Sequence, residues 1–329
     1  MSKKKQPITW IDTSDLVQQW QQDLLADHAP ATIRRYLAVI RRFLAWYEQQ
    51  ERLAFQPDDL TPIMLVGYRN MLHKTQTAST VNIHVCALRK WATWLTERAS
   101  LEVNPAGRFK QVARQAAHAP EPLTDNQINA LLRVASQSRH PQRDTAIVQL
   151  LLQTGLRIGE CARLNWGDIQ LGERQGQLIV RAGKGNKTRR VPLNGTARQA
   201  LTEYTAPLLE TEPILKRVIA AWPIPALARF QDPLWDSQKK GMLSVSAMQR
   251  MIDSLVRACA VRGLIPPSTS AHTLRHTFAR HYLAANPGDL AGLASILGHN
   301  SLNTTRIYVQ PTTDDLAERT ERLDLNAFA

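Results

Sequence analysis

Apolar side chains recur every three or four residues along the first hundred residues of this chain, and this period restricts what that part can fold into. Two series show it: Leu16, Trp20 and Leu24, followed by Ile33, Leu37, Ile40 and Leu44. Further helices are expected over residues 61–74 and 79–98. The pattern predicts a compact unit of four or five helices over residues 12–98, after a flexible basic terminus at residues 1–11.

The helical period stops at residues 99–120, which contain Pro105, Gly107 and Pro120 and are predicted to form a basic linker. A second unit is expected over residues 121–329, and its first helix begins at a capping box formed by residues 124–127. Apolar and polar residues then alternate over 176–181 and 188–193 around a glycine-rich turn, which predicts a small antiparallel sheet. The predicted fold class is mainly α with this one small sheet.

Two further segments of the second unit stand out in the sequence, and the purpose of the first is not readable. The separation between Leu193 and His272 is long for a minimal domain, so an insertion is expected around residues 205–240. A C-terminal tail at residues 312–329 has too little apolar surface to fold alone.

Net charge predicts a polyanionic partner. The chain has 41 Lys and Arg against 28 Asp and Glu, a formal charge of +13. Both predicted units are basic, with 16 cations against 10 anions over residues 1–118 and 25 against 18 over residues 119–329. An excess shared by two units suits an extended polyanion bound by both, with counterion release adding affinity. A basic surface that serves only solubility is the alternative.

The cysteines and apolar runs argue against other classes. Cys86, Cys161 and Cys259 lack the spacing of a zinc site or a disulfide framework, so neither is predicted. No run of 18 uncharged apolar residues occurs, and no apolar h-region follows the N-terminal lysines. We expect a cytoplasmic protein without membrane insertion or export.

Five short motifs stand in a fixed order along the second unit. They are Thr154-Gly-Leu-Arg157-Ile-Gly-Glu160, Gly183-Lys184-Gly-Asn-Lys187, His272-Thr-Leu-Arg275, Leu297-Gly-His299 and Thr305-Arg-Ile-Tyr308. Each motif alone recurs by chance, but the ordered set is specific. Together they resemble the active site of the tyrosine recombinase or phage integrase family, in its two-domain, Xer-like form. The resemblance covers most of the chain.

The resemblance implies a helical core DNA-binding domain followed by an α+β catalytic domain that cleaves and rejoins duplex DNA. Arg157 and Arg275 would bind the scissile phosphate, since planar guanidinium matches two phosphate oxygens. Tyr308 would attack the phosphorus to form a 3′-phosphotyrosine. His272 would take the phenolic proton, and His299 would hydrogen-bond a non-bridging oxygen.

The family pattern also assigns Lys184, in preference to Lys187, as the group that protonates the leaving 5′-oxygen. Glu160 would be a supporting carboxylate that orients the cations. No metal or other cofactor is expected, because arginine and lysine supply the charge stabilisation, and religation needs no ATP. A tetramer on two DNA sites is expected, and the C-terminal tail docks either on a neighbouring protomer or on its own domain.

Further cations are expected to contact DNA, although a solvated surface is the alternative for each. They are Arg34, Arg35, Arg41, Arg42, Arg89, Lys90, Lys187 and Arg189. Two other functions remain open: DNA relaxation by a type IB topoisomerase, and a non-catalytic DNA-binding regulator. The target sequence, accessory proteins, and a phage, transposon, integron or chromosome-resolution role cannot be read from the chain.

Overall fold

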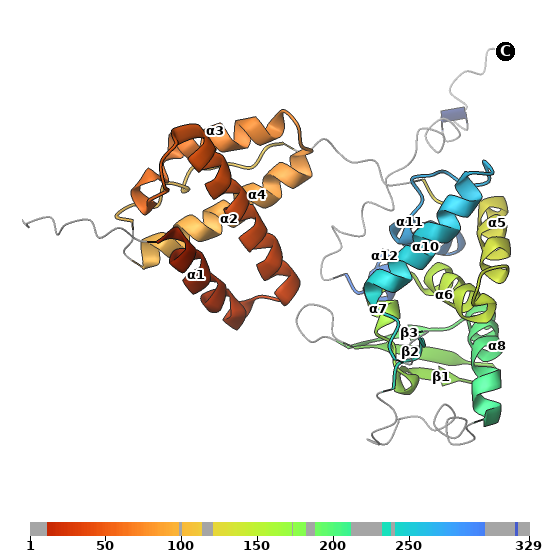
Figure 1. The fold of residues 1–329 in the computed structure, drawn as a ribbon. Coiled ribbons are helices and arrows are strands. Elements are labelled where there is room, and N and C mark those ends of the chain that lie inside the picture. The colour runs from red at the N-terminus through yellow and green to blue at the C-terminus, as the bar shows by residue number, and fades with distance from the viewer. Residues whose placement is uncertain are drawn as a thin grey trace, which may run out of the picture. The chain divides into compact units, whose positions relative to one another are not determined.

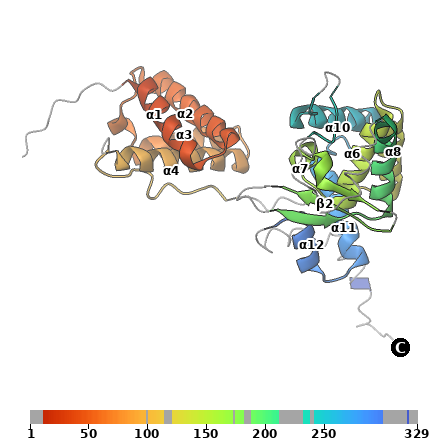
Figure 2. The same cartoon turned by 90° about the horizontal axis from the view of Figure 1, so that it is seen from below.

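The structure, a computed structural model, describes residues 12–98, 101–113, 121–172, 174–181, 188–211, 232–237, 241–299 and 320–321. The chain divides into two compact units, Met1–Ala117 and His118–Ala329. Figures 1 and 2 show their helices and strands.

The first unit is helical throughout its described part. Its elements are α1 (Thr13–Asp27), α2 (Pro30–Glu51), the short 3-10 helix η1 (Pro57–Asp59), α3 (Pro62–His73) and α4 (Ala78–Glu97). Side-chain caps set three of the helix starts, because Asp12, Thr61 and Thr77 accept hydrogen bonds from the first-turn amides of α1, α3 and α4. Helix α2 instead begins with Pro30, which supplies a preset φ angle.

Aromatic rings fill the core of the first unit. Phe43 of α2 is fully buried, and its ring meets those of Phe55, Tyr68 and Trp91 edge-on, with centroids 5.9, 5.1 and 6.3 Å away. Helix α2 packs against both α1 and α4, so its apolar face is covered from two sides. The three-and-four spacing of the sequence is therefore the spacing of a buried face.

Residues 101–113, the described part of the predicted linker, pack on the first unit. Phe109 is buried in the helical core, and the Arg69 guanidinium lies 5.8 Å from its ring centroid. The Asn82 side chain is buried and holds Val112 at two points, accepting from its amide at 2.8 Å and donating to its carbonyl at 3.0 Å. Arg69 also donates to the carbonyl of Lys110. This stretch is anchored to α3 and α4 because its backbone has fixed partners there.

The second unit combines helices with one small sheet. Its helices are α5 (Asp125–Ser136), α6 (Pro141–Thr154), α7 (Ile158–Ala162), the 3-10 helix η2 (Trp166–Asp168), α8 (Gly195–Thr211), α10 (Val245–Ala260), α11 (Ala271–Ala285) and α12 (Leu290–Leu297). Its strands are β1 (Ile169–Leu171), β2 (Gly176–Val180) and β3 (Arg189–Pro192).

The strands pair antiparallel in the order β1-β2-β3, with Leu178 opposite both Ile169 and Val191. Helix α6 lies at the centre of the unit and packs against α5, α8 and α11 (Figure 1). The predicted fold class, mainly α with a small antiparallel sheet, is confirmed. None of the described helices is both long and apolar enough to cross a bilayer.

The edges of the expected insertion around residues 205–240 belong to the core. Helix α8 runs to Thr211, and residues 212–231 lie outside the described part of the chain. After them, Leu234 and Trp235 are fully buried. The Trp235 indole donates to the carbonyl of Cys161 at 2.8 Å, and the Tyr204 hydroxyl donates to the carbonyl of Leu234 at 2.9 Å. These bonds join Trp235 to α7 and Leu234 to α8.

Candidate active site

Two helices end at the candidate site with a glycine in the left-handed conformation. Helix α6 ends at Gly155 with φ +62°, and α12 ends at Gly298 with φ +65°. A Cβ on Gly155 would lie 2.4 Å from Cδ1 of Phe278, and one on Gly298 would lie 2.8 Å from Nη1 of Arg189. Glycine is required for both the backbone angle and the space. Each turn leaves the last helical carbonyls without partners inside the helix.

Three arginines donate to those carbonyls. Arg275 of α11 is buried, and it donates from Nη1 to the Gly155 carbonyl at 2.6 Å and from Nη2 to the Leu297 carbonyl at 2.9 Å. Arg189 of β3 donates from Nε to the Ile296 carbonyl at 2.8 Å. Arg157 makes a long contact of 3.5 Å from Nη1 to the Leu297 carbonyl. The negative end of the α12 dipole stabilises this gathering of cations.

Glu160 joins two of these arginines. Its carboxylate accepts from the Arg157 amide at 2.9 Å and from Arg157 Nη1 at 3.0 Å, which begins helix α7. Arg189 donates to the same carboxylate from both Nη atoms, at 3.0 and 2.9 Å. Burial alone would raise the pKa of Glu160, but the bonds from Arg189 and the Arg157 amide lower it to about 2. Glu160 therefore stays ionised at neutral pH.

Exposure separates the two arginines expected to bind phosphate. The Arg157 side chain is 50% exposed, whereas Arg275 as a residue is 3% exposed. The Arg157 guanidinium is therefore accessible from solvent. The buried Arg275 guanidinium supplies charge from inside the unit, and its hydrogen bonds connect α11 to the ends of α6 and α12.

His299 lies directly against Arg275. Arg275 Nη2 donates to His299 Nε2 at 2.9 Å, so Nε2 is the acceptor and a neutral ring carries its proton on Nδ1. Burial first, and then the charges of Arg275, Arg157 and Arg189, lower the pKa of His299 to about 4. The ring is neutral at pH 7.

His272 stands one turn before Arg275 on α11, and its side chain is exposed. Its Nε2 lies 3.0 Å from Nε2 of His276. Partial burial of the ring and then the charges of Arg275 and Arg157 lower the pKa of His272. The histidine thus lies within the field of both arginines in its neutral form.

The structure brings Arg157, Glu160, His272, Arg275 and His299 to one place from three separate stretches of chain. Lys184, Lys187 and Tyr308 lie outside the described residues, as does the tail at 312–329 apart from residues 320–321. Among the described residues, no group of three or more His, Cys, Asp or Glu side chains could hold a metal ion.

Arg189 has a different setting from the DNA contact expected of it. Its guanidinium is largely buried and directed at Glu160 and the end of α12, so its geometry favours a positioning role. The sequence shows only a cation in a basic strand, 29 residues from its carboxylate partner. His276 is not among the residues predicted for the site, although its spacing of four from His272 on a helix signals contact.

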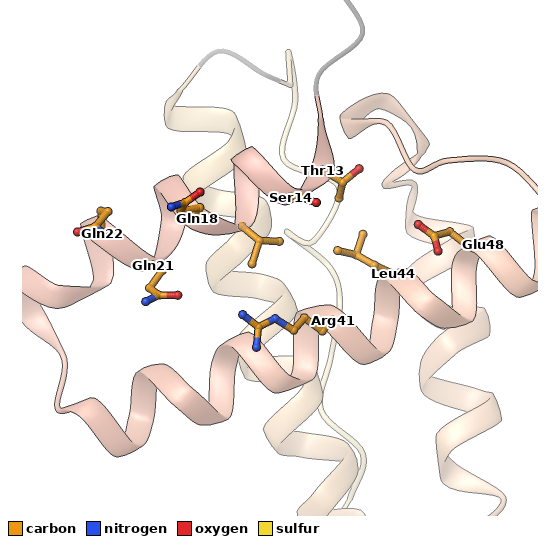
Figure 3. A pocket seen from close by; sticks show the side chains of 9 residues that line it. Thr13, Ser14, Gln18, Gln21, Gln22, Arg41, Leu44 and Glu48 are labelled. Carbon is orange, nitrogen blue, oxygen red and sulfur yellow. The ribbon is translucent and has the colours of Figure 1, made fainter.

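The cations expected to contact DNA in the first unit are exposed on two helices: Arg34, Arg35, Arg41 and Arg42 on α2, and Arg89 and Lys90 on α4. They do not share one face. Arg41 lines a groove of about 500 Å³ between α1 and α2, beside Gln18 and Gln21 (Figure 3). Arg42 instead lies near Tyr68 and His84. Burial raises the pKa of Tyr68 to about 12 against the opposing charge of Arg42, whereas burial and then the charge of Arg42 lower the pKa of His84 to about 4.

Comparisons with known proteins agree with this architecture. The Phage integrase family matches residues 121–314, and the Phage integrase N-terminal SAM-like domain matches residues 17–99. Tyrosine recombinase XerC of Pediococcus pentosaceus is 28% identical over 92% of this chain and 96% of its own. Tyrosine recombinase XerC of Thermodesulfovibrio yellowstonii is 31% identical over 80% of this chain and 82% of its own.

Solved structures share the fold at low identity. XerH recombinase bound to difH substrate, in a pre-cleavage complex, aligns with a TM-score of 0.64 and 20% identity over 94% of this chain and 85% of its own. A lambda integrase dimer bound to a COC′ core site aligns with a TM-score of 0.66 and 17% identity over 91% and 77%. From the match to its catalytic half and the identity to XerC proteins, the chain belongs to the phage integrase family of tyrosine recombinases.

Proposed function

We propose that this protein is a site-specific recombinase that cuts and rejoins duplex DNA through a covalent link between Tyr308 and a 3′-phosphate. The observation that carries the proposal is the convergence of Arg157, Arg275 and His299 at the ends of α6 and α12. Two guanidinium groups and a neutral imidazole that can donate from Nδ1, held by buried carbonyls and one ionised carboxylate, form a preorganised site for a phosphate.

The reaction proceeds by exchange of one phosphoester for another. The Tyr308 oxygen attacks phosphorus while its proton passes to His272, and the bond from phosphorus to the 5′-oxygen breaks. Lys184 protonates that leaving oxygen. The transition state carries about two negative charges, and Arg157 and Arg275 stabilise them as they grow. Attack by a 5′-hydroxyl reverses every step, so the bond energy is retained.

Glu160 and Arg189 act on this chemistry through the other residues. Arg189 neutralises Glu160, and Glu160 fixes the Arg157 backbone and side chain. The net charge offered to a phosphate is then that of Arg157 and Arg275. A carboxylate left without Arg189 would compete with the phosphate for both.

DNA binding by the first unit is assigned to exposed cations of α2 and α4. Arg35 and Arg42 stand two turns apart on α2, and Arg89 and Lys90 are exposed on the helix that α2 packs against. Arg34 and Arg41 lie about 100° further round α2, so they contact a different part of the backbone or remain solvated. A tetramer on two DNA sites in the cytoplasm is part of the same proposal.

The test uses nicked duplexes, which trap the intermediate because the strand downstream of cleavage diffuses away. A pool with randomised sequence is incubated with the protein, and covalent adducts are isolated under denaturing conditions and sequenced. Wild-type protein is expected to form adducts on a restricted set of sequences, and Tyr308→Phe to form none. Tyr36→Phe, which alters a half-buried tyrosine of α2, is the matched control.

Other outcomes would assign another function. Adducts without joining to a second duplex, together with relaxation of plasmid DNA, would indicate a topoisomerase. Specific binding without adducts on any bound sequence would indicate a regulator and overturn the proposal.

A further inference from the structure

His276 makes one contact that the proposed reaction does not yet use. It is 2% exposed and lies one helical turn after His272 on α11. The two Nε2 atoms are 3.0 Å apart, and the rings are perpendicular with centroids 4.5 Å apart. A contact of this length between ring nitrogens requires one proton between them, because two lone pairs or two N–H groups would repel.

That proton decides which nitrogen of His272 can act as a base. If His272 donates from Nε2, its lone pair is on Nδ1 and can receive a proton. If His276 donates instead, neutral His272 carries its proton on Nδ1 and has no lone pair left to act as a base. The partner of a catalytic histidine thus selects its tautomer.

The setting of His276 suits the accepting role. Burial first, then the charges of His272 and Arg275, lower the pKa of His276 to about 4, so its ring is neutral at pH 7. The charged side chain of Arg275 neighbours it in sequence and disfavours a second cation there. An aspartate in its place would orient His272 equally well but would add a negative charge beside the arginines that bind phosphate.

We propose that His276 is a positioning residue: its Nε2 accepts the Nε2–H of His272 and so keeps Nδ1 of His272 as the base that takes the Tyr308 proton. When Nδ1 is protonated, His272 becomes an imidazolium that still donates from Nε2 to His276. In the reverse step the Nδ1 proton returns to the phenolate, and the Nε2 proton never moves. This inference rests on the proposed function, since it assigns the state of that reaction's base.

Two substitutions separate orientation from packing. His276→Leu fills the buried space without an acceptor, whereas His276→Gln retains an oxygen that can accept from His272. His281→Leu, on the exposed side of the same helix, is the matched control. Single-turnover adduct formation on nicked duplex is measured from pH 5 to 9, together with DNA affinity and thermal unfolding.

We expect His276→Leu to slow adduct formation by about 10- to 100-fold, part of the usual contribution of a positioned base. DNA affinity should stay unchanged, and the pH profile should shift because His272 loses its fixed tautomer. His276→Gln should recover most of the rate. An unchanged rate in folded His276→Leu, or a His276→Gln rate as low as that of leucine, would overturn the assignment.

A second measurement does not depend on catalysis, and it uses a variant only to assign signals. Wild-type protein labelled with ¹⁵N-histidine reports the protonated nitrogen of each ring by NMR, and His272→Ala identifies the His272 signals. Protonated Nε2 with bare Nδ1 on His272 supports the proposal, and the opposite tautomer refutes it. Absence of adducts in wild type would instead count against the proposed function, whatever the tautomer.

Discussion

Arg189 and Glu160 form a two-point ion pair, with both Nη atoms of the arginine within 3.0 Å of the two carboxylate oxygens. The pair joins β3 to the start of α7, and the same arginine reaches the end of α12 through its Nε. One side chain of β3 therefore fixes the positions of the two segments that carry Arg157 and His299.

Replacement of Arg189 tests this registration. Arg189→Lys keeps the charge but cannot donate from two fixed nitrogens, so we expect adduct formation to fall at least about tenfold. Arg189→Ala leaves Glu160 short of partners and should lower the free energy of unfolding by about 2–3 kcal/mol. Single-turnover assays and urea unfolding measure the two effects. Arg190→Lys, on the exposed side of β3, is the control, and equal losses in both arginine-to-lysine variants would contradict the positioning role.

Arg157 and Arg275 should differ in what they contribute to stability. Alanine at either position is expected to lower adduct formation by about 10²–10³-fold, the usual scale for a charge-stabilising donor. Because Arg157 is half exposed, its removal should change the free energy of unfolding by less than about 1 kcal/mol. Arg275→Ala leaves the Gly155 and Leu297 carbonyls without this donor and should cost at least about 2 kcal/mol. Equal stability in the two variants would refute this division.

The glycines that end α6 and α12 should not tolerate a side chain. Gly155→Ala combines left-handed strain of about 1–2 kcal/mol with a clash against Phe278, and should destabilise the protein by about 2–4 kcal/mol in urea. Gly298→Ala should also displace Arg189 and reduce adduct formation. Gly263→Ala is a matched control, since its φ is +66° with nothing within 4 Å of the added Cβ. Equal losses of stability in all three variants would show that the clashes with Phe278 and Arg189 do not contribute to the effect.

Acid should weaken the protein through Glu160. Its pKa is about 2 when folded and near the ordinary 4.5 when unfolded, so as pH falls the unfolded chain takes up the proton first. The stabilisation, about 2–3 kcal/mol, is complete above pH 4.5 and is lost as pH falls from 4.5 toward 2. In urea unfolding, the wild-type advantage over Glu160→Gln should be constant from pH 7 to 5 and smaller at pH 3.5. A difference independent of pH would exclude an ionised Glu160 as its source.

The periodicity of apolar residues predicted which face of a single helix or strand is buried. Leu16, Trp20 and Leu24 are buried on α1 as their spacing requires, and the alternation through Leu178 and Val180 is that of β2. Such patterns arise because a helix or strand must bury one face, and they need no knowledge of the partner. The resemblance added the roles of the residues in the site motifs, and those roles stay predictions.

Contacts made by single polar groups were not predictable in the same way. Arg189 and Arg190 are adjacent residues of the same type, yet Arg189 binds a buried carboxylate and Arg190 is exposed. Asn82 holds the backbone of Val112 thirty residues away without any repeating signal. Such pairs depend on how elements approach one another in space, which a one-dimensional pattern does not encode.

Asn82 binds the backbone of Val112, and Arg69 binds that of Lys110. These contacts determine where two parent sequences can be joined in a hybrid enzyme. If only the helices are replaced, the junction lies near Arg98. Residues 101–113 of this chain must then pack on α3 and α4 of the other parent. Phe109 would then lose its pocket, and the donor helices would present an uncovered apolar patch. A hybrid that exchanges the first unit should therefore have its junction after Ala113. Residues 101–113 then come from the same parent as the helices on which they pack.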